Sequence, residues 1–382
     1  MHSVEEFVPE KTIELLKKQG YFLFGHSCVK TCHYTKQALR SQKVCYKQKF
    51  YGIQSHQCIQ MSPASTFCDQ KCVYCWRPTH TFIPKMDSLK NQPNGECLIQ
   101  SGSKKGTVTP GLSSKEIFDK PDEIVSESIR GQLVQLSGFG GFPNIDLVKL
   151  EQSKLPKHVA ISLTGEPTLY PLLAELIFEY HSKGISTFVV SNGLHPETIE
   201  KLIQSPPTQL YLSVDTSKKE SHLELNKPDF ADSWERLNRS IELLPKIKTR
   251  KVIRITCVKG KNMNHPEEFA ELIAKGKPDF VEVKGYVHVG FSQYRLPETA
   301  MPTFEEVQTF AKQIAEHLGY TYKTEDKDSF VCLLVSPEWK NKSTIIPFRE
   351  LFPTAYAEQD KHMAKWNARK EKLKQKKPKK EK

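Results

Sequence analysis

Short apolar runs alternate with segments of helical periodicity from residue 121 to residue 335, and this alternation limits the fold more than any other feature of the chain. The apolar runs cover 158–163, 187–191, 209–214, 251–258, 279–283 and 329–335. The helical segments cover 121–135, 171–182, 196–204, 233–244, 266–275 and 303–317. Strands separated by single helices pair in parallel through right-handed crossovers. Six such units before the last strand predict an α/β fold, a partial, TIM-like (β/α)6 barrel instead of a closed eight-fold one.

Polar residues follow several of the predicted strands directly. Gly165, Glu166 and Pro167 come after the first strand, Asn192 follows the second, and Ser213 ends the third. Further polar residues are Asp215 at the end of the third strand, Arg254 on the fourth and Lys284 at the end of the fifth. Active sites of such barrels collect at the carboxyl ends of the strands, so this end is the predicted cofactor pocket. Turn capping explains Asn192 and Ser213 nearly as well.

Three cysteines, Cys68, Cys72 and Cys75, lie in one short run, CDQKCVYC. Iron–sulfur clusters usually take four cysteines, so three thiolates on one loop can hold a [4Fe–4S] cluster and leave one iron without a protein ligand. An open coordination position marks a catalytic site, as it does for zinc. A zinc knuckle would need a second pair of ligands nearby, and none follows in the sequence. Buried structural thiols are the remaining alternative.

A second set of cysteines lies upstream at equal intervals of thirteen residues: Cys32, Cys45 and Cys58. Three thiolates could again leave one iron open. Equal spacing is weak evidence by itself, because ligand cysteines on separate turns can have any separation and free cysteines also pack as small hydrophobes. Cys28 could replace one of these ligands or add a fourth.

The ten cysteines of the chain are expected to be reduced. The amino terminus lacks the basic start and apolar stretch of a secretory signal. No apolar run approaches the ~20 residues that cross a bilayer. Cysteines in a chain of this kind favour metal ligation over disulfides. We therefore expect a cytoplasmic protein without a membrane span, whose thiols bind metal.

The net charge of +12 is concentrated in two segments. Residues 15–68 carry eight Lys or Arg and no acidic residue, and residues 365–382 carry ten Lys or Arg and two Glu. Basic segments attract the phosphates of nucleic acids through counterion release. In the first segment aromatic residues that can stack on unpaired bases lie among the cations, which predicts RNA binding, although part of the charge could offset a negative cluster. The second segment is also explained as a solubilising end.

Composition divides the chain into three parts. Residues 1–57 form an amino-terminal extension that carries upstream cysteines and a short helix at 11–18. Residues 58–350 contain the barrel, with a loop insertion at 86–114 in which Cys97 is an exposed bystander. Residues 351–382 form a carboxyl-terminal segment whose basic end is expected to be disordered.

Together, the two cysteine sets resemble those of the archaeal-type tRNA 4-demethylwyosine synthases, a family of the radical S-adenosylmethionine superfamily. The shared features are the cysteine spacing of 13, 13, 10, 4 and 3 residues, a lysine two residues after Cys45, and the phrases CVYCWRP, TGEPTLYP, SNG, LYLSVD and EVKGYVHVG in the same order. The resemblance extends from about Cys32 to the segment FPTAYA, and Cys28 and the 86–114 loop do not belong to it.

The resemblance implies a radical S-adenosylmethionine barrel with two [4Fe–4S] clusters, one on each cysteine set, and bound S-adenosylmethionine. In the superfamily a Gly-Glu-Pro-like segment accepts the ammonium group of the cofactor, which places Gly165, Glu166 and Pro167 in its site. Tyr74, Asn192 and Ser213 are further candidates for cofactor binding. A strand-to-helix turn with a glutamate favoured by the helix dipole is the alternative for Glu166.

For this family the resemblance implies a carbon–carbon lyase reaction on tRNA(Phe). A 5′-deoxyadenosyl radical takes hydrogen from the N1-methyl group of 1-methylguanosine 37 in the anticodon loop. The carbon radical adds to C2 of pyruvate, C1 is lost, and ring closure gives 4-demethylwyosine. Lys47 is the candidate catalytic residue, because it could form a Schiff base with pyruvate. Two alternatives for Lys47 remain open. It could pair with the carboxylate of pyruvate that is bound to the cluster, or it could be an ordinary surface lysine.

An external electron donor and a monomeric enzyme are also expected. Two other functions remain open from the sequence. One is another two-cluster radical enzyme acting on RNA or protein, such as a methylthiotransferase or a maturase. The other is a non-catalytic RNA-binding protein with structural metal, which predicts zinc and no cleavage of S-adenosylmethionine. Neither accounts for Lys47 and the TGEP segment together.

Overall fold

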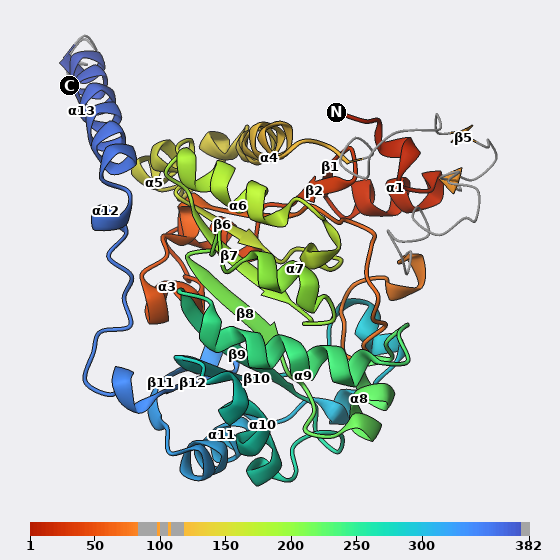
Figure 1. The fold of residues 1–382 in the computed structure, drawn as a ribbon. Helices are drawn as coiled ribbons and strands as arrows, with labels where there is room; N and C mark the ends of the chain where they lie inside the picture. The colour runs from red at the N-terminus through yellow and green to blue at the C-terminus, as the bar shows by residue number, and fades with distance from the viewer. Residues whose placement is uncertain (83–97, 100–105, 108–117, 376–382) are drawn as a thin grey trace.

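The computed structural model describes residues 1–82, 98–99, 106–107 and 118–375 (Figure 1). Within the 86–114 loop it describes the short strands β4 (Leu98–Ile99) and β5 (Gly106–Thr107), which pair in antiparallel orientation. Cys97 and the rest of that loop lie outside the described residues, so the exposure expected for Cys97 stays a prediction.

A ten-stranded mixed sheet forms the centre of the fold. Its six central strands are β3 (Cys58–Ser62), β6 (His158–Ile161), β7 (Ser186–Ser191), β8 (Gln209–Ser213), β9 (Arg250–Cys257) and β10 (Phe280–Gly285). All neighbours in this series pair in parallel, which confirms the predicted partial (β/α)6 barrel. Parallel sheets are covered on both faces, and accordingly every residue of β7 is buried.

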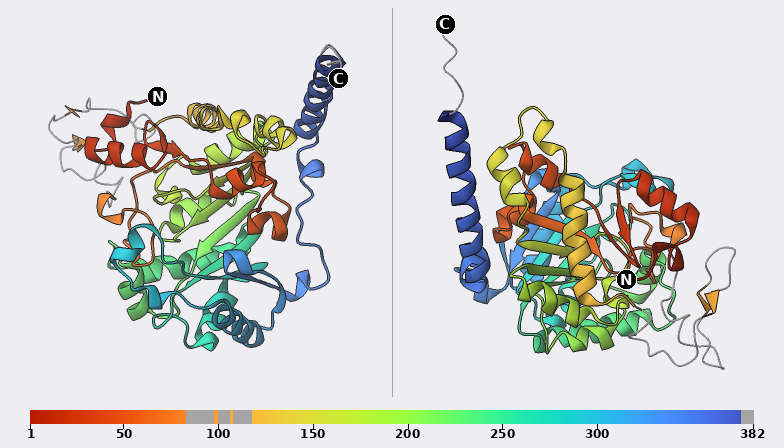
Figure 2. Two further views of the ribbon diagram at one scale, coloured as in Figure 1. Left: turned by 180° about the vertical axis from the view of Figure 1, so that it is seen from behind. Right: turned by 90° about the horizontal axis from the view of Figure 1, so that it is seen from above.

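Helices cover the outside of the parallel strands (Figure 2). They are α4 (Pro121–Leu136), α5 (Leu147–Ser153), α6 (Leu173–Ser182), α7 (Pro196–Lys201), α8 (Lys219–Asn226), α9 (Ser233–Leu243), α10 (Pro266–Gly276) and α11 (Phe304–Leu318). Neighbouring helices pack against each other, as α7 does with α9 and α10 with α11. The six predicted helices are confirmed, whereas α5 and α8 were not predicted. Both are short, with only seven and eight residues, so their periodicity is weak.

Antiparallel strands extend the sheet at both edges, which the sequence did not predict. On one side β1 (Phe22–Phe24) and β2 (Ser27–Val29) precede β3, and on the other β12 (Val331–Val335) and β11 (Thr321–Asp326) follow β10. Parallel pairing of the last strand, expected from the alternation, is therefore wrong. Strand β11 comes directly after α11, and the turn at Lys327–Ser329 reverses the chain, so β12 runs opposite to β10.

The amino-terminal segment joins the two sides of the open barrel. It contains α1 (Glu10–Lys18), which confirms the helix predicted at 11–18, and then α2 (His33–Leu39) and α3 (Tyr46–Tyr51). The hydroxyl of Tyr34 lies 2.9 Å from Ser329 Oγ, and Lys49 Nζ lies 2.5 Å from Asp326 Oδ2. The segment that follows β2 thus contacts the β11–β12 turn at the opposite edge of the sheet.

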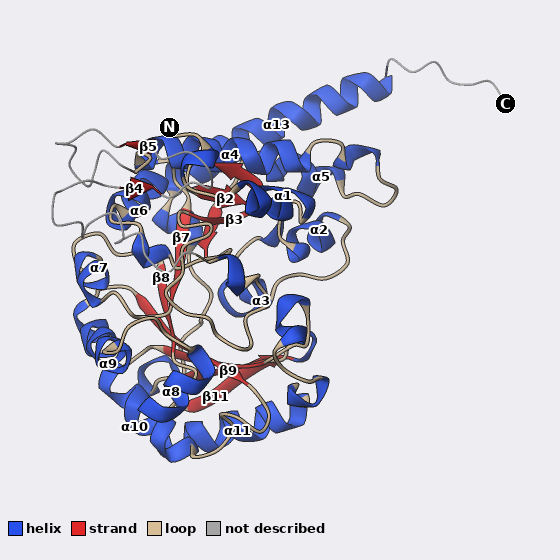
Figure 3. Ribbon diagram, turned by 90° about the vertical axis from the view of Figure 1, so that its right-hand side faces the viewer, coloured by secondary structure: helices blue, strands red, loops and turns tan. Residues whose placement is uncertain are grey.

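Two helices end the described chain, α12 (Phe348–Leu351) and α13 (Pro353–Gln375). The first turns of α13 pack on the body through buried Tyr356 and Gln359, and the helix then projects away from the body (Figure 3). The helix continues through residue 375, into the basic end that was expected to be disordered, and residues 376–382 lie outside the described chain. Among the described helices, none is both long and apolar enough to cross a membrane.

Candidate active site at the carboxyl ends of the parallel strands

The cysteine loop, defined here as residues 68–75, follows β3 and is held by two other segments. The amide of Lys71 donates to the carbonyl of Asn226, at the end of α8, over 3.1 Å. From the loop after β10, Arg295 Nε donates to the carbonyl of Val73 over 3.2 Å. The end of α8 and the loop after β10 therefore hold the backbone between the three cysteines.

Burial raises the pKa values of all three thiols of the cysteine loop, that of Cys72 to about 12. Buried thiolates at this place need a positive partner, which a metal cluster supplies. A tetrahedral zinc site would hold its ligand sulfurs roughly 3.8 Å apart around Zn–S bonds of ~2.3 Å. In the described part of the chain, neither cysteine set has three sulfurs all within 4.8 Å of one another. The wider spacing fits the separate irons of a cluster.

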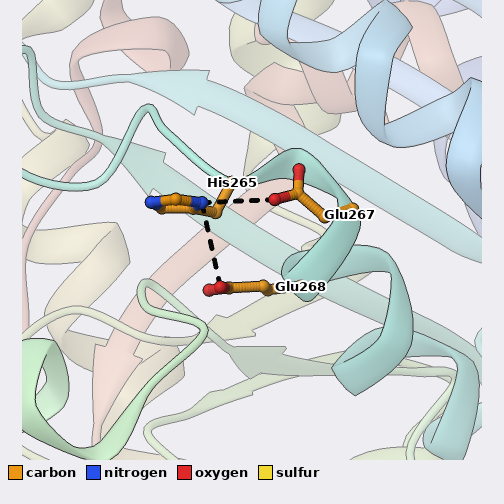
Figure 4. Close-up of side chains that lie close together, drawn as sticks. All are labelled: His265, Glu267 and Glu268. Carbon is orange, nitrogen blue, oxygen red and sulfur yellow. Dashed lines mark hydrogen bonds and ion pairs between the residues drawn. The ribbon is translucent and has the colours of Figure 1, made fainter.

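A compact group of candidate metal ligands does lie elsewhere, at the start of α10 (Figure 4). Nδ1 of His265 is 3.2 Å from Glu267 and 3.8 Å from Glu268. Glu268 is already paired with Lys218 at 2.7 Å, and carboxylates in the first turn of a helix are stabilised by its dipole. Helix-end electrostatics accounts for this exposed group, and we assign no metal to it.

Gly165 packs directly against the base of the cysteine loop. Its φ is +67°, and a Cβ at this position would lie 1.8 Å from the carbonyl oxygen of Ala64. The amide of the next residue, Glu166, donates to the carbonyl of Phe67 over 2.8 Å. Glycine is required for this approach, and the Gly-Glu-Pro segment is thereby anchored to the residues immediately before Cys68.

We expect Gly165→Ala to lower the free energy of unfolding by about 2–6 kcal/mol, because left-handed strain adds to the clash with Ala64. Gly260 is the matched control, since its φ is +74° but a Cβ added there would meet no atom within 4 Å. Gly260→Ala should cost only about 1 kcal/mol. Denaturant unfolding of both variants measures the difference. Equal losses would contradict the close packing at Gly165.

A hydrogen-bond network ties Glu166 to the cysteine loop. The Glu166 carboxylate accepts from the amide of Asn192 over 2.8 Å, and Asn192 Nδ2 donates to Asp69 Oδ1 over 2.6 Å. His195 Nε2 lies 2.7 Å from the other oxygen of Asp69. Burial acts to lower the pKa of His195, but the hydrogen bond to Asp69 raises it to about 10. A charged imidazolium therefore holds Asp69 beside Cys68, and both Glu166 and Asn192 have structural partners.

Tyr74 and Asp215 join the cysteine loop to the end of β8. The Tyr74 hydroxyl donates to Asp215 Oδ2 over 2.5 Å, and Asp215 Oδ1 accepts from the amide of Thr256 over 2.6 Å. Ser213 is partly exposed, and its hydroxyl has no hydrogen-bond partner within the described ranges. Of the predicted cofactor contacts in this region, the Ser213 hydroxyl is therefore the one free to bind a ligand.

One cavity of about 400 Å³ brings the upstream cysteines together inside the barrel. Cys32 and Cys45 precede α2 and α3, and Cys58 begins β3, so three separate elements supply the thiols. Residues that line the cavity include Cys32, Cys45, Cys58, Lys47, Trp76, Arg254 and Lys284. Fully buried Cys28 packs instead with Leu16 and Tyr21, and it does not line this cavity.

Lys47 is held in the cavity by aromatic faces. Its Nζ lies 4.2 Å from the centroid of the Tyr211 ring and 5.9 Å from that of Phe188. Burial lowers the pKa of Lys47, and the nearby carboxylate of Glu282 acts in the opposite direction. Glu282 accepts hydrogen bonds from two tyrosines over 2.9 and 2.7 Å. Among the described residues no carboxylate pairs with Lys47, so its amine is available to a ligand.

Two further cations share this cavity. Burial, with the charge of Arg254, lowers the pKa of Lys284 to about 8. Lys284 Nζ donates to the carbonyl of Ser329 over 2.5 Å, so its position is fixed by the turn that also contacts α2. The cavity thus offers one amine on aromatic rings and two further cations, of which Lys284 is held by a hydrogen bond, a suitable set for a small carboxylate.

Known proteins resemble this chain along most of its length. The model of the Radical SAM superfamily matches residues 62–273, and the model for Wyosine base formation matches residues 275–336. The S-adenosyl-L-methionine-dependent tRNA 4-demethylwyosine synthase of Pyrococcus abyssi is 41% identical over 332 residues, which are 86% of this chain and 89% of the relative. This chain belongs to the tRNA 4-demethylwyosine synthase family.

Other members of the synthase family support the same assignment. The synthase of Methanocaldococcus jannaschii is 35% identical over 330 residues, covering 86% of this chain and 96% of its own. The solved structure "Structure of TYW1 with a lysine-pyruvate adduct bound" has a TM-score of 0.74 and 31% identity, and covers 89% of this chain and 100% of that chain. "Crystal structure of archaeal TYW1" has a TM-score of 0.67 and 29% identity, with the same coverage.

The two family models include some of the predicted site residues and leave others outside their matched ranges. The superfamily match includes the cysteine loop and the Gly-Glu-Pro segment, and the wyosine match includes Lys284. Cys32, Cys45, Cys58 and Lys47 all precede residue 62, outside both matched ranges, so their roles as cluster ligands and catalytic residue stay predictions of the synthase resemblance.

Sequence reasoning missed several residues that build the site of this synthase-family member. Asp69, His195, Asn226 and Arg295 position the cysteine loop or the Gly-Glu-Pro segment. Only two of them have a sequence signal, adjacency to a motif: Asp69 is next to Cys68, and His195 follows the SNG phrase closely.

Proposed function

We propose that this chain is a carbon–carbon lyase that uses S-adenosylmethionine and pyruvate to convert N1-methylguanosine 37 of tRNA(Phe) into 4-demethylwyosine. The observation that carries the proposal is the cavity that brings Lys47 and the upstream cysteines to Trp76, the residue that follows the cysteine loop. The reaction requires that the radical, pyruvate and the RNA base meet in one enclosed space, because orientation supplies much of the rate enhancement.

The cysteine loop fits a [4Fe–4S] cluster with one open iron, because its three thiols are buried and too widely spaced for one ion. Such a cluster supplies the electron that cleaves S-adenosylmethionine to methionine and a 5′-deoxyadenosyl radical. We assign the ammonium group of the cofactor to the carbonyls of Thr164 and Gly165, which accept no backbone hydrogen bond from the described residues. The Glu166 carboxylate is already used by Thr168 and Asn192.

The upstream cysteines fit a second [4Fe–4S] cluster, since they lie on three elements around one cavity, and as three ligands they would leave one iron without a protein ligand. Lys47 then binds pyruvate: its neutral amine attacks C2, water leaves, and a Schiff base forms. The solved TYW1 with a lysine–pyruvate adduct supports this choice over chelation of pyruvate by the cluster. Lys284 and Arg254 are the cations that would pair with the pyruvate carboxylate.

The RNA approaches, in this proposal, from the side of the basic amino-terminal segment. Lys36 and Lys43 are exposed there, and Arg40 is partly exposed. A base beside the anticodon lies in a single-stranded loop, which proteins can splay open and stack. The proposal also includes a separate electron donor, a cytoplasmic location and a monomeric enzyme.

Incubation of the anaerobically reconstituted protein with a reductant, S-adenosylmethionine, carbon-labelled pyruvate and tRNA(Phe) bearing N1-methylguanosine 37 tests the function. Label carried by C2 and C3 should enter the RNA, and label at C1 should not, because C1 is lost. The same tRNA without the N1-methyl group is the control and should stay unlabelled. Absence of label from the methylated tRNA would refute the proposed function.

A further inference from the structure

Exposed aromatic side chains gather beside the cysteine loop. Trp76, directly after Cys75, is 48% exposed, and Tyr294 is 84% exposed. Phe291 links them, because its amide donates to the carbonyl of Trp76 over 3.1 Å and its ring centroid is 5.9 Å from that of Tyr294. Large apolar groups kept in water indicate an interaction surface, because burying them would stabilise the fold.

Trp76 is held firmly in this exposed position. Gly290 has a φ of +60°, and a Cβ there would lie 2.5 Å from the carbonyl oxygen of Trp76, so the loop after β10 packs closely on its backbone. The guanidinium carbon of Arg77 lies 3.4 Å from the centroid of the indole ring. Arg77 is itself only 4% exposed. A buried cation therefore covers one side of the indole, and Trp76 also lines the cavity that contains Lys47.

Unpaired nucleic-acid bases fit such a surface well. Bases stack on aromatic rings whatever their sequence, and nearby cations hold the phosphates. Trp76 directly follows Cys75 in the sequence and lines the cavity of the upstream cysteines, where the reaction is proposed to occur. Residues 15–68, which supply much of this wall, carry a net charge of +8. This charge favours RNA over an apolar protein partner.

We propose that Trp76 is the stacking platform for the purine whose N-methyl group reacts. The inference rests on the proposed function and adds a residue that positions the substrate base. Stacking on the free part of the indole places the flipped purine at the mouth of the cavity. Its N-methyl group then faces the cavity lined by Lys47 and the upstream cysteines.

Trp76→Ala and Trp76→Phe test the platform, with Phe178→Ala as the matched control. Phe178 is 65% exposed on α6 and does not line the cavity. For an anticodon stem–loop with N1-methylguanosine, Trp76→Ala should raise KM on the order of 10-fold, whereas Trp76→Phe should stay within about threefold because its ring still stacks. Phe178→Ala should behave as the wild type. An unchanged KM in Trp76→Ala would overturn the inference.

Two binding measurements separate stacking from a structural role. A stem–loop that lacks the base at position 37 should bind Trp76→Ala and wild type equally, and a remaining defect would overturn the inference. The chain has four tryptophans, so RNA should quench wild-type fluorescence more than that of Trp76→Phe. Equal quenching would also overturn it.

The outcomes distinguish this inference from the proposed function. Failure of the wild type to label tRNA would refute the proposed function. An active wild type together with an unchanged KM in Trp76→Ala would refute stacking alone.

Discussion

Lys47→Arg is expected to abolish incorporation of pyruvate carbon into tRNA while leaving the cavity positively charged. Arginine cannot form the Schiff base, because its guanidinium stays protonated in proteins. Covalent capture holds pyruvate at a fixed place, and such intramolecular positioning corresponds to effective molarities of about 10⁵ M or more. We therefore expect a loss of at least about 10³-fold in the rate of label incorporation.

Borohydride reduction followed by peptide mass spectrometry measures the adduct directly. After incubation with pyruvate, the wild type should carry a reduced pyruvyl group on Lys47, and Lys47→Arg should carry none. Lys49 is the matched control on the same helix, because it pairs with Asp326 at 2.5 Å outside the cavity lining. Lys49→Arg should keep the adduct and the activity. An adduct on Lys284 in the wild type, in place of Lys47, would show that the assignment is wrong.

The second large effect is expected from joint replacement of Cys32, Cys45 and Cys58 by alanine. After anaerobic reconstitution the iron content should fall from about eight to about four per chain, because one of two [4Fe–4S] clusters loses all its ligands. Product formation should stop, because the pyruvate bound to Lys47 would no longer lie beside the second cluster. S-adenosylmethionine should still be cleaved, because the cysteine loop is unchanged.

Cys28→Ala is the matched control for this replacement. Cys28 is fully buried and lies among apolar residues, and burial raises the pKa of its thiol to about 12. Its removal should leave the iron content unchanged. If the triple variant keeps all its iron, the upstream cluster does not exist. If Cys28→Ala loses iron, the ligand set differs from the three cysteines proposed here.

Much of the fold could be predicted because the periodicity of apolar residues along the chain indicates its strands and helices. The alternation of strands and helices predicts parallel strands, and β6 to β10 confirm five of them, whereas β3 was not predicted as a strand. The edge strands could not be predicted in the same way. Strand β11 has only one buried residue in six, so it lacks the apolar pattern that marks the central strands. Without it, the antiparallel direction of β12 could not be inferred.

Some residues of the candidate site could likewise be predicted from the sequence, and others could not. Gly165 is recognisable in the sequence because its motif requires a positive φ and a close backbone approach. The ion pair of Asp69 with His195 is not, since the two residues are far apart in the chain and meet only where β3 and β7 end at the same edge of the sheet. Exposure of Trp76 likewise depends on the loop after β10.

The sequence by itself determined the chemical groups and the order of the elements: two sets of three thiols, a lysine next to one of them, and alternating strands and helices. These follow from residue type and periodicity, which act over a few neighbours. Only the tertiary structure decided that Cys32, Cys45 and Cys58 share one cavity with Lys47, and that the amino-terminal segment contacts the far edge of the sheet. Such contacts depend on strand register and packing across the whole chain, which no local pattern encodes.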